Sequence, residues 1–122
     1  MTRLTRVRHE LLALHRALLA AERITYERVH GRVSAGAFLE LVIGAAEFAW
    51  LRPMTALIVA IDEVLDDKLV LAARDEADYL ADVRKLLVPD PAGSEFERRY
   101  AAALHEVPDV VLAHGAVMRE LP

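Results

Sequence analysis

The sequence predicts an all-α fold, a compact bundle of about five to six helices, and three observations support it. Apolar residues recur with a period near 3.6 along most of the chain, whereas the alternating pattern of strands is almost absent. The first apolar stripe runs from about Arg3 to His30, and a helix of that length spans roughly 40 Å. With 122 residues, 55% of them hydrophobic, and no cysteine, the chain suits a single helical-bundle domain over residues 1–122.

The predicted first helix carries the clearest apolar stripe. Its spacing alternates between three and four residues, which keeps the side chains on one face of an α-helix. The residues of this stripe are Leu4, Val7, Leu11, Leu14, Leu18 and Ala21. Leu12 and Leu19 widen the stripe, and Gly31 supplies a C-terminal stop. The remaining helices are therefore expected to pack alongside this long helix.

The middle of the chain predicts further helices with one interruption. Ser34 is a suitable cap for a second helix, which continues until Pro53 removes a backbone donor. We expect a kink or a break at Pro53. The helical pattern then resumes, and one uninterrupted helix up to Pro89 would span roughly 50 Å. We therefore place a turn near Ala72–Glu76.

The last third of the chain contains the plainest loop, residues 88–94. Ser94 and Glu97, three residues apart, form a capping box that predicts the start of a helix. Pro108 is placed to begin a last short helix, because the first helical turn needs no backbone donor there.

Charge is distributed unevenly along the chain. The formal net charge is −4, but residues 1–32 carry seven Arg against three Glu, so this segment has +4 and the remainder −8. A basic helix can bind nucleic acid or an anionic membrane. These arginines, however, are spread around the helix, and no row of aromatic residues accompanies them. We expect them to pair with acidic segments of the same fold, and we expect no nucleic-acid partner.

The sequence predicts no membrane span. The apolar stretch Ala37–Ile61 is interrupted by three charged residues, and its longest run without a charge is nine residues. Spanning a bilayer requires about 20. The N-terminal stretch lacks the apolar run and cleavage pattern of a signal peptide, and the chain has no cysteine. These features favour the cytoplasm.

The second helix is apolar around most of its circumference, since only Glu40, Gly44 and Glu47 form a polar strip. A bundle of short helices cannot easily bury such a helix on every side. An exposed surplus of apolar area is typical of an interface, and the sequence therefore predicts a homodimer. The interface is expected to use three aromatic residues: Phe38, Phe48 and Trp50.

A row of polar residues follows the apolar face of the first helix. Arg8, His15 and Glu22 are seven residues apart, a spacing that brings them to nearly the same angle around the helix. Tyr26, one turn after Glu22, projects in the same direction. Because these side chains fall between the leucines of the buried face, each needs a polar partner, a ligand or a place at the rim.

Two further polar residues lie on apolar faces of other predicted helices. Asp62 stands among the apolar residues of the third helix, and His114 among those of the last. Asp62 is the natural partner of Arg8 or His15, because a carboxylate attracts a cationic side chain.

The polar residues allow two main interpretations. One is a buried hydrogen-bonded network that fixes the register of the helices, in which Tyr26 caps Glu22. The other is a pocket between helices, in which His15 and Glu22 contact a ligand.

The sequence contains no recognisable catalytic motif. It lacks a glycine-rich phosphate loop, a nucleophile elbow and cysteine, and its two serines, Ser34 and Ser94, are expected to cap helices. Glu27 and His30 have the Glu-x-x-His spacing of di-iron bundles, but the chain has no second copy of that pair. We therefore expect no metal or other cofactor.

These observations favour a small non-catalytic helical bundle that acts as a protein-interaction or small-ligand-binding module. The candidate ligand-binding residues are Arg8, His15, Glu22, Tyr26, Asp62 and His114. The alternative is a metal- or haem-dependent protein, or a small helical enzyme, with a site between helices around His15, Glu22 and Asp62.

Overall fold

The computed structural model describes residues 2–66 and 73–122, and every regular element within these ranges is a helix. The elements are α1 (Arg3–His30), α2 (Ala35–Gly44), the 3-10 helix η1 (Ala46–Leu51), α3 (Arg52–Asp66), α4 (Ala73–Leu86), α5 (Glu95–Glu106) and α6 (Pro108–Glu120). The predicted all-α bundle is therefore confirmed, and so is its long first helix of 28 residues.

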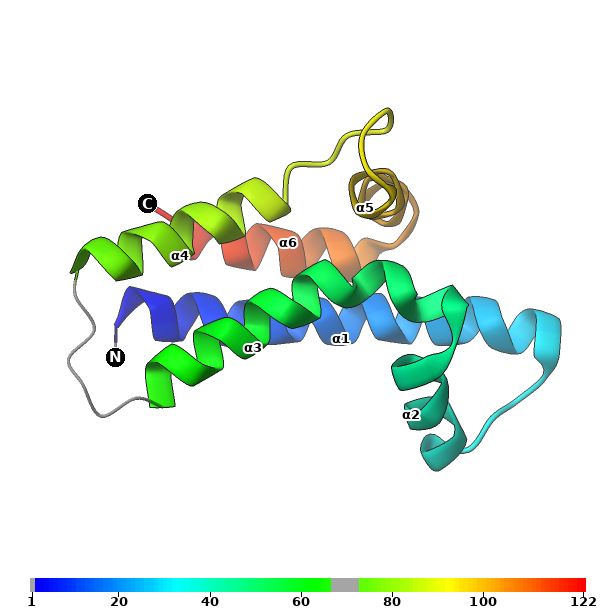
Figure 1. The fold of residues 1–122 in the computed structure, drawn as a ribbon. Coiled ribbons are helices and arrows are strands. Elements are labelled where there is room, and N and C mark those ends of the chain that lie inside the picture. The colour runs from blue at the N-terminus through cyan, green and yellow to red at the C-terminus, as the bar shows by residue number, and fades with distance from the viewer. Residues whose placement is uncertain (1, 67–72) are drawn as a thin grey trace.

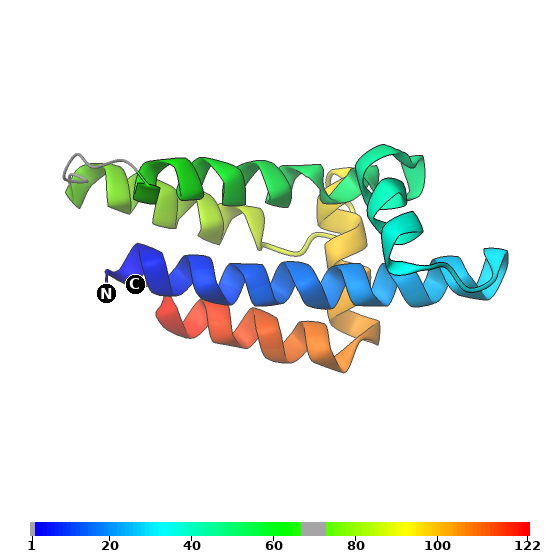
Figure 2. The same ribbon diagram turned by 90° about the horizontal axis from the view of Figure 1, so that it is seen from below.

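The long helix α1 forms the axis of the bundle. α6 runs along one side of α1, whereas α3 and α4 lie on the other side (Figure 2). α5 crosses the bundle, since it is seen end-on in Figure 1 and from the side in Figure 2. The two ends of the chain meet beside the start of α1, where Arg3 Nη1 donates to the Glu120 carbonyl at 3.0 Å.

The core follows the predicted apolar stripe of α1. This stripe is buried from Leu4 to Leu18, and Ala21 beyond it is half-buried. Opposite the stripe, η1, α3, α4, α5 and α6 each contribute buried apolar side chains. These elements therefore share one core that runs along α1.

Local sequence signals set the ends of several helices. The side chain of Ser34 accepts a hydrogen bond in the first turn of α2. Ser94 and Glu97 form the predicted capping box, because each side chain accepts from the backbone N–H of the other. Pro108 begins α6 as predicted. Gly31 ends α1 with φ 84°, a left-handed conformation that favours glycine.

The break predicted at Pro53 lies earlier in the chain. α2 ends at Gly44 and Ala45 is extended, so α2 is bent by 71° from the η1–α3 segment that follows. Pro53 itself sits in the first turn of α3, where a missing backbone donor breaks no helical hydrogen bond. The change from 3-10 to α-helix occurs beside it, at Arg52. The bend at Ala45 turns η1 into the core, where several of its side chains are buried.

Residues 54–88 contain two helices rather than one. α3 ends at Asp66 and α4 begins at Ala73, so their connection falls outside the described residues. The turn predicted near Ala72–Glu76 is displaced, since residues 73–76 form the first turn of α4 and Ala72 lies outside the described residues. The acidic residues in that first turn interact favourably with the positive end of the helix dipole, which favours a helix over a turn there.

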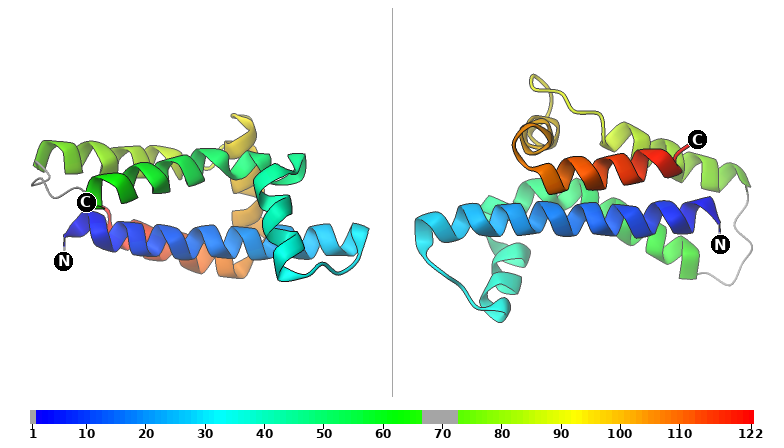
Figure 3. Two further views of the ribbon diagram at one scale, coloured as in Figure 1. Left: turned by 60° about the horizontal axis from the view of Figure 1, so that its bottom comes forward. Right: turned by 180° about the vertical axis from the view of Figure 1, so that it is seen from behind.

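α2 projects from one end of the bundle, below the last turns of α1 (Figures 1 and 3). It packs mainly on η1, and none of its residues is buried. No single helix within the described ranges is long and apolar enough to cross a membrane, and only the bent pair of α2 with η1–α3 reaches the necessary length and composition. The chain thus leaves an apolar helix at its surface.

Candidate functional site

The polar row of α1 lies at the rim of the core rather than inside it. Every member of the row is partly exposed, and the part of the chain that the structure describes buries no charged side chain. The reason is that Leu12 and Leu19, which flank the row on its far side, are themselves only partly buried. The predicted network is therefore not buried, and Arg8 and His15 each make a separate polar pair instead.

The first pair joins α1 to α3. Arg8 Nε donates to Asp62 Oδ1 in an ion pair. The two side chains are 37% and 35% exposed, so water screens the attraction. Ion pairs of this kind contribute about 0–1 kcal/mol to stability. The structure confirms Asp62 as the partner of Arg8.

His15 is bound to Thr55 and not to Asp62. His15 Nε2 lies 3.1 Å from Thr55 Oγ1, while the Thr55 hydroxyl donates to the Leu51 carbonyl at 3.2 Å. Since a hydroxyl carries one proton, Thr55 accepts and His15 Nε2–H donates. Burial lowers the pKa of His15, because the imidazolium ion loses hydration. His15 is thus a neutral donor that links α1 to α3.

His114 belongs to a different pair, between α5 and α6. The Tyr100 hydroxyl lies 2.6 Å from His114 Nδ1. Burial raises the pKa of Tyr100 and lowers that of His114, so the hydroxyl keeps its proton and the ring is neutral. Tyr100 therefore donates to His114 Nδ1, and His114 has its partner outside the α1 row.

Tyr26 contacts aromatic rings rather than the carboxyl of Glu22. Its ring stacks on His30 with centroids 4.3 Å apart and lies 5.9 Å from the ring of Phe48. The predicted cap of Glu22 by Tyr26 is not found among the hydrogen bonds of the described residues. Tyr26 instead joins the end of α1 to η1.

The three aromatic residues predicted for a dimer interface occupy different environments. Phe48 and Trp50 are only 2% and 4% exposed, because the bend at Ala45 turns η1 into the bundle. These two rings are therefore covered by other parts of the same chain. Phe38 is partly exposed, with its ring 5.4 Å from that of Phe48 and the Arg23 guanidinium 4.9 Å above it.

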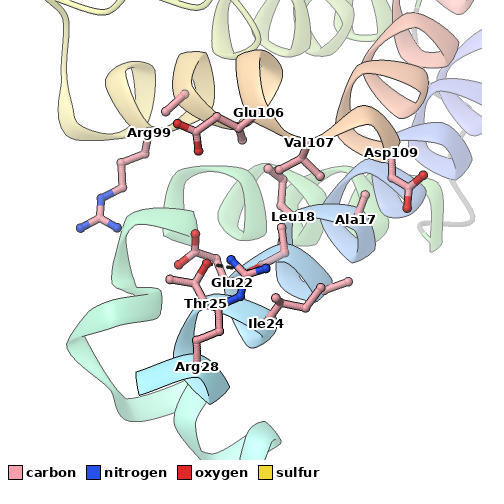
Figure 4. Close-up of a pocket in the computed structure, with 14 residues that line it drawn as sticks. Ala17, Leu18, Glu22, Ile24, Thr25, Arg28, Arg99, Glu106, Val107 and Asp109 are labelled. Carbon is pink, nitrogen blue, oxygen red and sulfur yellow. Dashed lines mark hydrogen bonds between the residues drawn. The ribbon is translucent and has the colours of Figure 1, made fainter. Parts of the chain in front are cut away.

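Glu22 lines a cleft between the second half of α1 and α5, which we call the α1–α5 cleft (Figure 4). Its volume is about 470 Å³, and its lining includes apolar side chains such as Leu18 and Val107. Figure 4 shows Arg99 and Glu106 coming from α5 on one side and Arg28 from α1 on the other. The cleft can therefore present charges of both signs above an apolar surface.

A smaller cleft of about 160 Å³ adjoins the first, and we call it the aromatic cleft. Its lining residues are Glu22, Thr25, Tyr26, Val29, His30, Glu47, Phe48 and Arg99. Glu22, Thr25 and Arg99 line both clefts, so Glu22 stands where the two meet.

The surroundings of Glu22 make its charged form less favourable than it is in water. Burial raises the pKa of this carboxyl, and the indole of Trp50 and the charge of Arg99 only partly oppose that effect. The Trp50 Nε1–H group is buried and makes no hydrogen bond of ordinary geometry with any described residue. It is near enough to Glu22 to lower the pKa but does not satisfy the carboxyl fully. Glu22 and Trp50 therefore leave hydrogen-bonding capacity unused.

The charged residues that α5 contributes to the cleft were not predicted from the sequence. Arg99 and Glu106 are seven residues apart and therefore share a helix face, which is a signal that spacing alone could provide. Nothing in the local sequence, however, indicates that α5 crosses α1 beside Glu22.

The residues of the alternative metal, haem or enzyme site are not brought together. His15 and Glu22 are about 10 Å apart along α1 by helical rise alone. Asp62 pairs with Arg8, and the described residues contain no group of three or more His, Asp or Glu side chains that could hold a metal ion. Glu27 of the Glu-x-x-His pair accepts a hydrogen bond from Val33 N at 2.9 Å. This bond links the end of α1 to the loop that leads to α2.

Comparison with known proteins gives no significant match to a family model, a curated sequence or a solved structure. The exposed face of α2 and the cleft around Glu22 are therefore the features from which a function can be argued.

Proposed function

We propose that the protein is a non-catalytic helical module that acts by binding, and that it forms a homodimer through α2. The observation that carries this proposal is the position of α2. This helix of 10 residues is the most apolar α-helix described, yet none of its residues is buried. Exposure of such an apolar surface to water is unfavourable, and contact with a second copy would remove the surface from water.

The two faces of α2 differ in what covers them. Phe38, Leu41 and Val42 are partly buried, and the ring of Phe38 contacts that of Phe48 in η1. Leu39 and Ile43, one turn apart on another side of the helix, are 61% and 71% exposed. Burying one such side chain contributes about 1.5–3 kcal/mol. A contact that covers both residues in both copies therefore supplies a substantial part of a dimer's stability.

The exposed face of α2 also has a shape that suits a second copy. Gly36 and Gly44 flank Glu40 on a stripe beside the ridge of Leu39 and Ile43. A Cβ atom added at either glycine would meet nothing within 4 Å, and neither glycine has a positive φ. The protomer itself therefore gives no reason for glycine at these positions.

An antiparallel pair of α2 helices would use that shape. Ile43 of one copy would lie against Gly36 of the other, and two-fold symmetry repeats the contact. Glycine lets the backbones approach closely, while the long side chain of Glu40 can extend to solvent. The face is thus complementary to itself, as a two-fold interface requires.

A matched pair of charge substitutions tests this proposal. Ile43→Glu places a carboxylate in the interface and is expected to convert the dimer to a monomer by sedimentation velocity. Leu112→Glu on α6 is the control, because Leu112 is 70% exposed against 71% for Ile43. The control should remain dimeric. Dimerisation of both variants, or loss of the dimer in both, would contradict an interface through α2.

Binding of a small molecule is a second function that a specific observation favours. The α1–α5 cleft is lined by the partly buried carboxyl of Glu22, whose hydrogen-bonding capacity is not fully used. Clefts between helices of a bundle are common ligand sites, and a few polar groups above apolar walls are typical of them.

A further inference from the structure

The charges around Glu22 are predominantly negative. The α1–α5 cleft is lined by Glu22, Glu106 and Asp109 against Arg28 and Arg99, and the aromatic cleft adds Glu47. Carboxylates therefore outnumber guanidinium groups in each cleft, which favours a cationic ligand over an anionic one.

The charged residues that line the clefts also differ in how far they are buried. Glu22 is the one charged residue among the described lining residues of both clefts that is not exposed. A carboxylate in a partly desolvated position interacts more strongly with a cation than an exposed one does. The charge that would dominate recognition in the clefts is thus the negative charge of Glu22.

The arginines are less available to a ligand. The Arg99 guanidinium lies 6.0 Å from the centroid of the Trp50 ring, and its Nε is 4.0 Å from Glu95. Arg28 comes from α1 and is exposed, so water screens its charge. These positions weaken the case for an anion in the clefts.

The aromatic cleft, which also contains Glu22, is lined by aromatic rings. Tyr26 and Phe48 line the aromatic cleft, with their centroids 5.9 Å apart. The face of an aromatic ring attracts a cation, and its carbon surface also packs against an apolar group.

We propose that the two adjoining clefts bind an organic ammonium ion, an amine that carries an apolar or aromatic body. The ammonium group donates to the Glu22 carboxylate, and the body of the ligand packs against the rings of Tyr26 and Phe48 or against the apolar lining of the α1–α5 cleft. This assignment rests on the small-ligand function proposed above and names the class of ligand.

The chain's single tryptophan provides a direct measurement. The Trp50 indole lies next to Glu22, which lines both clefts, so its one N–H signal in a ¹⁵N-¹H NMR spectrum should respond when a ligand binds to Glu22. Three probes of similar shape but different charge are titrated: benzylammonium, benzyl alcohol and benzoate. We expect benzylammonium to shift the signal in a saturable way, with a Kd at least about tenfold lower than that of benzyl alcohol or benzoate.

A pair of variants tests whether the carboxylate of Glu22 binds the ammonium group. Glu22→Gln keeps the shape of the side chain and is expected to raise the Kd for benzylammonium by about tenfold or more. Glu63→Gln, on the exposed side of α3, is the control and should leave the Kd unchanged. Should Glu22→Gln fail to fold, the ranking of the three probes on the wild-type protein still tests the proposal.

The outcomes separate the ligand class from the small-ligand function. If benzyl alcohol or benzoate binds as tightly as benzylammonium, the cleft is a ligand site but the ammonium assignment is wrong. If none of the three probes shifts the Trp50 signal, both the assignment and the small-ligand function are overturned.

Discussion

At the scale of single residues, several of the polar side chains on the apolar faces have polar partners on neighbouring helices. Arg8 pairs with Asp62, His15 donates to Thr55, and His114 accepts from Tyr100. The spacing of the row predicted the direction of its side chains correctly. It could not predict their burial, because burial depends on how far the neighbouring helices extend over α1.

The lowered pKa values of the two histidines lead to a prediction of how stability changes with pH. Burial lowers the pKa values of His15 and His114 below 6.5, so the unfolded chain takes up protons before the folded protein does. Their contribution is complete above about pH 6.5 and is lost as the pH falls toward the folded-state pKa values. We expect the free energy of urea unfolding to decrease between about pH 7.5 and 5.5.

The variant His114→Gln isolates one of these contributions. It should show a smaller decrease over the same pH range than the wild type. Glu22 acts in the opposite direction, because burial raises its pKa, but both proteins contain Glu22 and its effect cancels in the comparison. An identical pH dependence in the two proteins would show that His114 is not held neutral by the fold.

At the scale of helices, local signals predicted most of the boundaries. The stripe of α1, the cap at Ser34, the capping box at Ser94 and the start of α6 at Pro108 all depend on residues close in sequence. The bend at Ala45 does not, because it forms where η1 gains burial in the bundle. For the same reason the sequence could not show that Phe48 and Trp50 are covered within the protomer.

The glycines of α2 lead to a prediction in which the stability of the fold and the affinity of the dimer change in opposite directions. Gly36→Leu places a larger side chain at the position proposed to lie against Ile43 of the second copy. Because a Cβ at position 36 meets nothing within the protomer, the helix itself should tolerate leucine and gain up to about 1 kcal/mol from its better propensity.

Association should respond in the opposite sense. Overpacking an interface costs about 1–3 kcal/mol, so the Kd of the dimer should rise roughly ten- to hundredfold. Sedimentation equilibrium measures this constant, and Ala81→Leu, exposed on α4, serves as the control. A Kd that Gly36→Leu leaves unchanged would show that this position does not lie against a second helix.

At the scale of the whole molecule, the two proposed binding surfaces lie toward the same end of the bundle. α2 projects there, and the clefts around Glu22 lie between the second half of α1 and α5 (Figures 1 and 4). Two of the candidate residues named from the sequence, Glu22 and Tyr26, line these clefts. Sequence reasoning missed Arg99, because the meeting of Glu22 with α5 is a contact between segments far apart in the chain.

The mass of the wild-type protein in solution tests the central claim most directly. One chain has a mass of 13.6 kDa. Sedimentation equilibrium over a range of micromolar concentrations should give a mass that rises with concentration to twice this value, as expected for a reversible dimer through α2. A constant mass of 13.6 kDa up to high micromolar concentration would contradict the account.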